Sequence, residues 1–111
     1  MTNWMDKVLT LLGFASKAGK LSYGFDAVRT SLSQKKSKLL LLATDVSPKS
    51  KKEILFFGDK FSVEVIDLEK IDMQTLSHAV GRKCGILSVN DQSFAQGLIA
   101  AINAGRNLND K

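Results

Sequence analysis

The chain has 111 residues, a net charge of +5 and a sequence pI of about 9.5. This length suits one domain with its own core, and a hydrophobic fraction of 44% with a single proline excludes a disordered chain. The single cysteine excludes an intramolecular disulfide and a zinc site built from several cysteines. No apolar run approaches the roughly 20 residues of a membrane span and no secretory signal pattern is present, so we expect a cytoplasmic protein with no membrane partner.

The first half of the chain predicts two helices and two strands. Apolar residues spaced three and four apart over residues 3–17 indicate an amphipathic helix, which Asn3 caps and Gly19 ends. The continuous apolar run over residues 38–44 is typical of a strand buried on both faces. Between them we expect an extended piece over residues 21–23 and a second helix from Gly24 or Phe25 to Leu32.

The second half continues this alternation. Ser47 and Pro48 are typical of a helix cap and first turn, and Gly58 of the helix end. A strand over 62–67, a helix over 73–80 ended by Gly81, a strand over 84–89 and a helix over 92–104 follow, with 106–111 as a frayed polar tail. The alternation predicts a single α/β domain over residues 1–111, with helices on both sides of a parallel or mixed sheet.

Groups suited to catalysis are sparse. His78 is the single histidine and has no carboxylate at metal-ligand spacing, so we expect no metal site. Cys84 and His78 are a conceivable nucleophilic pair, but a cysteine that opens an apolar strand is more commonly packed. No glycine-rich phosphate loop is present. We therefore predict no enzyme, no catalytic residues, no cofactor and no small-molecule substrate.

Charge is distributed unevenly along the chain. Residues 17–52 carry nine basic and two acidic side chains, a net charge of +7, whereas residues 53–72 carry two basic and six acidic ones, a net charge of −4. This asymmetry favours one face for a polyanion and another for water. Scattered, solvated lysines are the alternative interpretation.

The first stretch suited to RNA covers residues 17–29. It contains Lys17, Lys20 and the start of the second helix, where free N–H groups bind phosphate readily. Asp26 in the first turn can accept hydrogen bonds from a guanine edge, and Arg29 can reach a base or a phosphate. An acidic residue at this position also favours the helix dipole without any ligand, so both interpretations stay open.

Two further stretches are basic and lie at helix or strand boundaries. Lys49, Lys51 and Lys52 lie at the start of the third helix, where each positive charge opposes the helix dipole at a cost of roughly a few tenths of a kcal/mol. A phosphate ligand would offset this cost; alternatively, the lysines are solvated and the small cost is tolerated. Residues 81–85 place Arg82 and Lys83 between two glycines. Glycines allow a base or sugar to approach the backbone closely, although a plain turn would also use one.

Three segments, in this order and at this spacing, resemble a known family. They are LGFASKAGK at residues 12–20, SKLLLLATDVS at 37–47 and LSHAVGR at 76–82. They resemble the kink-turn RNA-binding ribosomal proteins, which include the archaeal L-seven-Ae type, and most nearly the bacterial YlxQ-type ribosomal-associated members. The resemblance covers residues 12–102 and implies a three-layer α/β/α sandwich around a mixed sheet. It also implies a second helix that enters an RNA groove near sheared G·A pairs, and a late loop that contacts an extruded nucleotide.

By position, Asp26 falls where the family has a guanine-reading acid and Arg29 where it has a lysine. Phe25 stands at the usual asparagine, where it can stack on a base or pack in the core, and Ser77 stands at a usual glycine. The expected partner is structured RNA of kink-turn or related bent-bulge type, ribosomal or on the ribosome; a protein-interaction module that has lost specific RNA recognition is the alternative. The predicted RNA-binding residues are Lys17, Lys20, Gly24, Phe25, Asp26, Arg29, Lys36, Asp45, Lys49, Lys52, Gly81, Arg82, Lys83 and Cys84.

Overall fold

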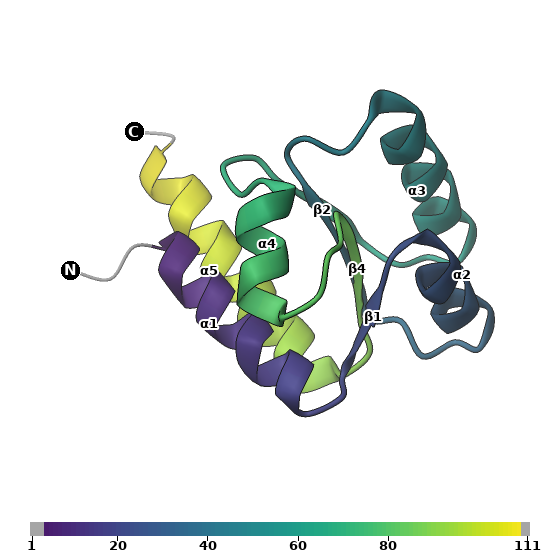
Figure 1. Cartoon of the computed structure of the whole chain (residues 1–111), viewed down its shortest axis with the longest axis horizontal. Helices are drawn as coiled ribbons and strands as arrows, with labels where there is room; N and C mark the ends of the chain where they lie inside the picture. Colours follow the sequence, from purple (N-terminus) through teal and green to yellow (C-terminus); the bar gives the residue numbers. More distant parts are fainter. Residues whose placement is uncertain (1–3, 110–111) are drawn as a thin grey trace.

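The computed structural model describes the backbone of residues 4–109 and the side chains of residues 4–105. Helices and strands alternate along this range (Figure 1). In chain order they are α1 (Trp4–Lys17), β1 (Leu21–Tyr23), α2 (Phe25–Ser33), β2 (Leu39–Ala43), α3 (Pro48–Lys60), β3 (Val65–Leu68), α4 (Met73–Val80), β4 (Ile86–Val89) and α5 (Gln92–Asn109).

The strands form one mixed sheet in the order β1-β4-β2-β3. β2 and β3 are parallel and are joined by α3, whereas β4 runs antiparallel to both of its neighbours, β1 and β2. β2 is a central strand and all five of its residues are buried, as its continuous apolar run predicts. The expectation of a mixed sheet is confirmed.

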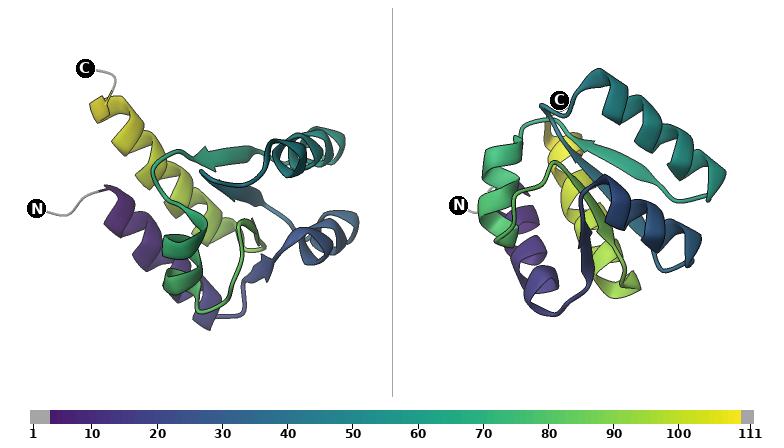
Figure 2. Two further views of the ribbon diagram at one scale, coloured as in Figure 1. Left: turned by 45° about the horizontal axis from the view of Figure 1, so that its top comes forward. Right: turned by 45° about the vertical axis from the view of Figure 1, so that its right-hand side comes forward.

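Helices cover both faces of the sheet, with α1, α4 and α5 on one side and α2 and α3 on the other (Figure 2). Alternate residues of β2 point to opposite faces: Leu39 and Leu41 pack with the first group of helices, and Leu40 and Leu42 with the second. The predicted three-layer α/β/α sandwich is therefore confirmed, with a separate apolar cluster on each face of the sheet.

The prediction that Gly58 ends the third helix was wrong. α3 continues to Lys60, and Gly58 is buried inside it. A Cβ at this position would clash with Val65 Cγ2 and come within 2.9 Å of the Val63 carbonyl oxygen. The glycine lets α3 approach β3 closely, and the chain turns instead at Ser62, which has a φ of 58°. The strand therefore begins at Val65 rather than at residue 62.

The ends of two other elements also differ from expectation. The last strand begins at Ile86, because Cys84 and Gly85 belong to the preceding loop. α5 continues beyond the predicted end at 104, as far as Asn109. The frayed tail predicted over 106–111 stays a prediction, since residues 110 and 111 and the expected cap Asn3 lie outside the described residues. Across residues 4–109, no helix combines the length and apolar character needed to cross a membrane.

Candidate nucleic-acid interface

A groove opens at the end of the sheet where β1 and β2 finish and β4 begins. The Gly24 N–H donates to the Ile86 carbonyl oxygen at 2.9 Å and fixes the start of α2 beside β4. This strand-end groove has a volume of about 450 Å³ and is lined by Gly24, Phe25, Asp45, Val46, Ser47, Ser50, Met73, Gly85 and Ile86. It brings together three of the predicted residues, Gly24, Phe25 and Asp45.

A neighbouring hollow at the start of α4 shares Asp45 and Met73 with the groove. This hollow, of about 420 Å³, is lined by Asp45, Met73, Gln74, Ser77 and Lys83. Asp45 Oδ1 accepts a hydrogen bond from the Met73 N–H at 2.8 Å. Asp72 Oδ1 accepts one from the Thr75 N–H, also at 2.8 Å, and this bond lowers the pKa of the Asp72 carboxyl. Both carboxylates therefore hold the start of α4, and Lys83 supplies the positive charge of the hollow.

The start of α2 lies against α3. Gly24, with a φ of 87°, precedes the helix, and its position provides no side-chain cap for the first N–H groups. Phe25 is half-buried and packs edge-on against Phe57, with ring centroids 6.0 Å apart. The Arg29 guanidinium lies over both rings, 5.9 Å from the Phe25 centroid and 5.4 Å from that of Phe57. Of the two roles the sequence leaves open for Phe25, the structure shows packing, whereas Asp26 is exposed.

The late loop follows α4 and is fastened to β1. Gly81 ends α4 in the left-handed conformation, with a φ of 77°. The Arg82 guanidinium then lies over the Tyr23 ring, 4.9 Å from its centroid. The Tyr23 hydroxyl is hydrogen-bonded to Ser16 Oγ, which also contacts the Val80 carbonyl oxygen at 2.8 Å. These contacts link α1, β1 and the end of α4 at the point where the loop begins.

Cys84, one of the predicted RNA-binding residues, is buried, whereas the residues before it in the late loop are exposed. Its side chain is 6% exposed and packs in the core, and burial raises the pKa of its thiol. Its backbone is also occupied, because Ser77 Oγ accepts from the Cys84 N–H at 2.9 Å and donates to the Cys84 carbonyl oxygen at 3.1 Å. Ser77, at a position where the family resemblance suggests glycine, thus ties the loop to α4. Arg82 and Lys83 remain exposed.

The lysines at the start of α3 divide into two groups. Lys51 forms an ion pair with Asp67 of β3 at 2.7 Å, and this hydrogen bond raises the pKa of the Lys51 ammonium. Lys49 and Lys52 are exposed on the outer side of the helix. Lys49 and Lys52 are accordingly available to a ligand, whereas Lys51 connects α3 to the sheet.

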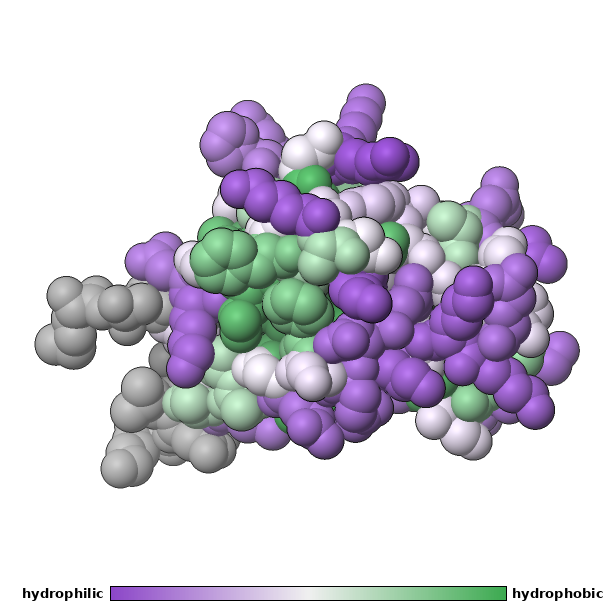
Figure 3. All heavy atoms as spheres, turned by 90° about the horizontal axis from the view of Figure 1, so that it is seen from below, coloured by the Kyte–Doolittle hydropathy of each residue, from purple (hydrophilic) through white to green (hydrophobic). Residues whose placement is uncertain are grey.

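The structure does not bring every predicted lysine to the groove. Lys20 precedes β1 and its carbonyl oxygen accepts from the Asn90 N–H, at the opposite end of the sheet from Gly24. Lys36 follows α2 at that same end, and Lys17 ends α1. Seen from below, hydrophilic side chains cover the half of the surface over α2 and the loop after it, while apolar ones gather over α1 and α5 (Figure 3).

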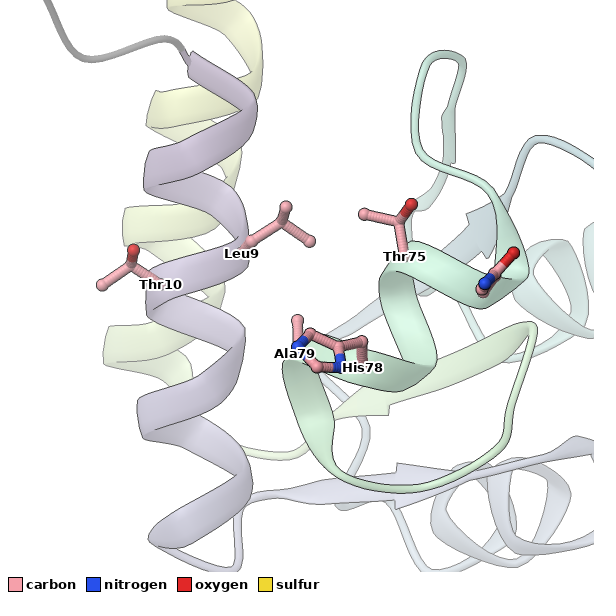
Figure 4. Close-up of a pocket in the computed structure, with 6 residues that line it drawn as sticks. Leu9, Thr10, Thr75, His78 and Ala79 are labelled. Atoms are coloured by element: carbon pink, nitrogen blue, oxygen red, sulfur yellow. The ribbon is translucent and has the colours of Figure 1, made fainter.

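A separate hollow of about 590 Å³ lies between α1 and α4 and contains none of the predicted RNA-binding residues. Leu9 points from α1 towards α4, where Thr75 and His78 face it, whereas Thr10 points away (Figure 4). His78 is exposed and Cys84 is buried with a raised thiol pKa, which disfavours the thiolate that a nucleophilic pair requires. Among the side chains of residues 4–105, no three acidic, histidine or cysteine groups gather as metal ligands would.

Several residues that shape the interface were not predicted from the sequence. Tyr23 and Met73 carry no charge and lie outside the three family-like segments, so composition and spacing give no signal for them. Ser77 lies in the third segment but was noted only as a departure from a usual glycine. Phe57 also carries no charge, and its ring contacts with α2 depend on how α2 and α3 pack side by side on one face of the sheet.

These features define an α/β/α sandwich with a groove at one end of its sheet and exposed basic residues in the loop after α4. Residues 6–99 match the Ribosomal protein L7Ae/L30e/S12e/Gadd45 family, and the chain belongs to this family. It is a family of ribosomal and related proteins rather than of enzymes, as the lack of catalytic groups in the sequence predicts.

Two curated relatives are similar over most of the chain. RNA-binding protein YlxQ of Bacillus subtilis (strain 168) is 30% identical over 95 residues, which cover 84% of this chain and 92% of that protein. RNA-binding protein YlxQ of Enterococcus faecium is 29% identical over 91 residues, which cover 81% of this chain and 85% of that protein. The predicted resemblance to the L-seven-Ae-type family, with YlxQ-type members among its relatives, is confirmed.

Two solved structures share the fold. A protein of unknown function from Bacillus halodurans C is 28% identical, with a TM-score of 0.82 over 87% of this chain and 97% of that one. The 15.5kD RNA binding protein of Giardia lamblia is 13% identical, with a TM-score of 0.72 over 95% and 89% of the chains. The second likeness, at so low an identity, concerns the fold alone.

Proposed function

We propose that the protein binds structured RNA at the strand-end groove, with the start of α2 and the late loop on either side of it. The observation that carries this proposal is the placement of Gly24 and Lys83 in two adjoining hollows that share Asp45. These residues come from three distant parts of the chain. The free N–H groups at the start of α2 attract phosphate, and membership of a ribosomal protein family and similarity to proteins named as RNA-binding support the same ligand.

The finer proposal is a kink-turn or related bent-bulge RNA, on the ribosome and hence in the cytoplasm. Exposed Asp26 is the candidate reader of a guanine edge, because its carboxylate can accept two hydrogen bonds. Phe25 packs against Phe57 and offers no amide, so base reading at this position is reduced. Lys49, Lys52 and Lys83 would mainly contact phosphates, which position an RNA without reading its sequence.

A titration with two RNAs tests both levels of the proposal. One RNA carries a bulge flanked by sheared G·A pairs, and the other has the same length with those pairs converted to Watson–Crick pairs. We expect tighter binding of the first and an affinity for both that falls as salt rises. Equal affinities would reject kink-turn selectivity alone. Absence of salt-sensitive binding to either RNA would reject RNA binding and favour a protein-interaction module.

A further inference from the structure

A second groove, between α2 and α3, has the chemistry of a nucleotide site. It has a volume of about 360 Å³, within the range of small-ligand sites, and is lined by Asp26, Arg29, Thr30, Ser33, Phe57, Lys60 and Phe61. The two helices lie side by side on one face of the sheet in both views (Figure 2). We propose that this inter-helix groove binds one unpaired nucleotide of a single-stranded RNA segment, which extends the interface of the proposed function on which this inference rests.

Both cations of the groove rest on aromatic rings. Arg29 Cζ lies 5.4 Å from the centroid of Phe57, and Lys60 Nζ lies 5.7 Å from that of Phe61. Cation–π contacts of this kind restrict long, flexible side chains before a ligand arrives. Arg29 lies over the rings of both Phe25 and Phe57, and RNA-binding proteins commonly stack a base on the planar guanidinium of an arginine. Arg29 is therefore a platform for a base, and Lys60 a partner for its phosphate.

The polar groups of the groove fit a nucleotide rather than a bare anion. The hydroxyls of Thr30 and Ser33 donate to carbonyl oxygens of their own helix, those of Asp26 and Thr30, at 3.1 and 3.0 Å. Lys60 is consequently the main donor left for a phosphate, because Arg29 serves as the platform for the base. The Asp26 carboxylate lines the same groove and accepts hydrogen bonds, which suits the amino or imino edge of a base and disfavours an anion alone.

An exposed aromatic side chain lies next to this site. Phe56 is 62% exposed and packs edge-on against Phe57, with ring centroids 5.5 Å apart. One helical turn separates it from Lys60 and another from Lys52, so an aromatic ring alternates with positive charge along the outer side of α3. Aromatic rings beside positive charge bind single strands with little sequence preference, because every base has a stacking face. Arg29 and Lys60, against the single carboxylate of Asp26, give the groove lining a net positive charge, which favours RNA over a protein as the occupant.

The test is an NMR titration of the full chain with tetrauridylate, which is too short to form a bent-bulge structure. Inorganic phosphate is titrated separately. We expect tetrauridylate, and not phosphate, to shift the backbone amides of Thr30, Ser33 and Lys60. Lys60→Gln should weaken this binding about three- to tenfold, through loss of one phosphate contact. Lys7→Gln is the matched control, because Lys7 is also an exposed helical lysine but lies on α1, across the sheet.

The outcomes separate this inference from the proposed function. Lys60→Gln should leave the affinity for the Watson–Crick-paired RNA unchanged. Tetrauridylate therefore reports on the inter-helix groove, and the structured RNA reports on the proposed function. Unmoved groove amides, equal shifts with phosphate alone, or equal losses in Lys7→Gln and Lys60→Gln would each overturn the nucleotide site while structured RNA still binds. Unmoved amides with tetrauridylate would leave the groove as a protein contact instead.

Discussion

The guanidinium of Arg82 lies 4.9 Å from the ring centroid of Tyr23, so the basic loop after α4 rests on the strand that leads into α2. Ser16 Oγ is hydrogen-bonded to the Tyr23 hydroxyl and also contacts the Val80 carbonyl oxygen at the end of α4. The two segments that flank the strand-end groove are thereby held in place before any ligand binds. Such preorganisation reduces the entropy that binding would otherwise cost.

The first prediction concerns the coupling between these two residues. Tyr23→Leu removes the ring under Arg82, and we expect it to weaken binding of the bent-bulge RNA about three- to tenfold, in line with a cation–π contact. In a chain that already carries Arg82→Gln, the same change should have little further effect. Affinities of the two single variants and the double variant, measured by fluorescence anisotropy, give the coupling energy directly.

Tyr23→Phe is the matched control for this cycle. It keeps the ring and the contact with Arg82 and removes only the hydrogen bond to Ser16, so the RNA affinity should change less than in Tyr23→Leu. A general loss of folding caused by Tyr23→Leu would weaken binding equally in the unchanged chain and in the chain that carries Arg82→Gln. Additive effects of Tyr23→Leu and Arg82→Gln on RNA affinity would therefore show that the stacked pair does not act as a unit in binding.

Much of the fold could be predicted because helical and strand periodicities are local properties of the chain. The apolar spacing before Lys17 and the apolar run of β2 each led to the correct element. The end of the third helix was wrongly predicted at Gly58, because glycine occurs both at helix ends and where two elements approach closely. Only the position of β3 against α3 shows which of these applies, and that contact is made by Val63 and Val65.

The candidate site could be predicted in part for the same reason. Charged residues such as Arg82 and Lys83 are conspicuous in the sequence, and the glycines around them indicate a loop. The roles of Ser77, Tyr23 and Phe25 depend on partners far along the chain: Ser77 on the backbone of Cys84, and the two aromatic residues on other side chains. Pairings of this kind follow from strand order, which periodicity does not determine.

The second prediction concerns the reactivity of Cys84. Burial disfavours its thiolate and raises the thiol pKa, so iodoacetamide should alkylate the native protein far more slowly than the urea-unfolded chain at pH 8. Because the folded pKa lies above the unfolded one, the stabilising effect is complete below the ordinary thiol pKa and is lost as the pH rises through the folded value. Cys84→Ala should lack this alkaline component of unfolding. Native and unfolded rates that coincide would contradict the buried position.

The third prediction concerns a buried polar network beneath α2. Ser88 is fully buried, and its Oγ lies 2.7 Å from Ser37 Oγ and 2.6 Å from Asn90 Oδ1. Ser88→Ala would leave these two groups without a partner, and we expect a loss of about 1–3 kcal/mol in the free energy of unfolding. Ser33→Ala, at an exposed serine of α2, should change it by less than about 0.5 kcal/mol. Equal effects in urea denaturation would show that the network contributes little.

The fourth prediction uses two glycines that both lie inside helices. A Cβ at Gly58 would clash with Val65 and approach the backbone oxygen of Val63 to 2.9 Å, so Gly58→Ala should lower the free energy of unfolding by about 1–3 kcal/mol. At Gly97 the nearest atom is Leu11 Cδ1 at 3.7 Å, an ordinary contact. Gly97→Ala should therefore raise it by about 0.5–1 kcal/mol, because alanine restricts the unfolded chain and favours the helix. Urea denaturation followed by circular dichroism measures both, and effects of the same sign would contradict the close packing of α3 on β3.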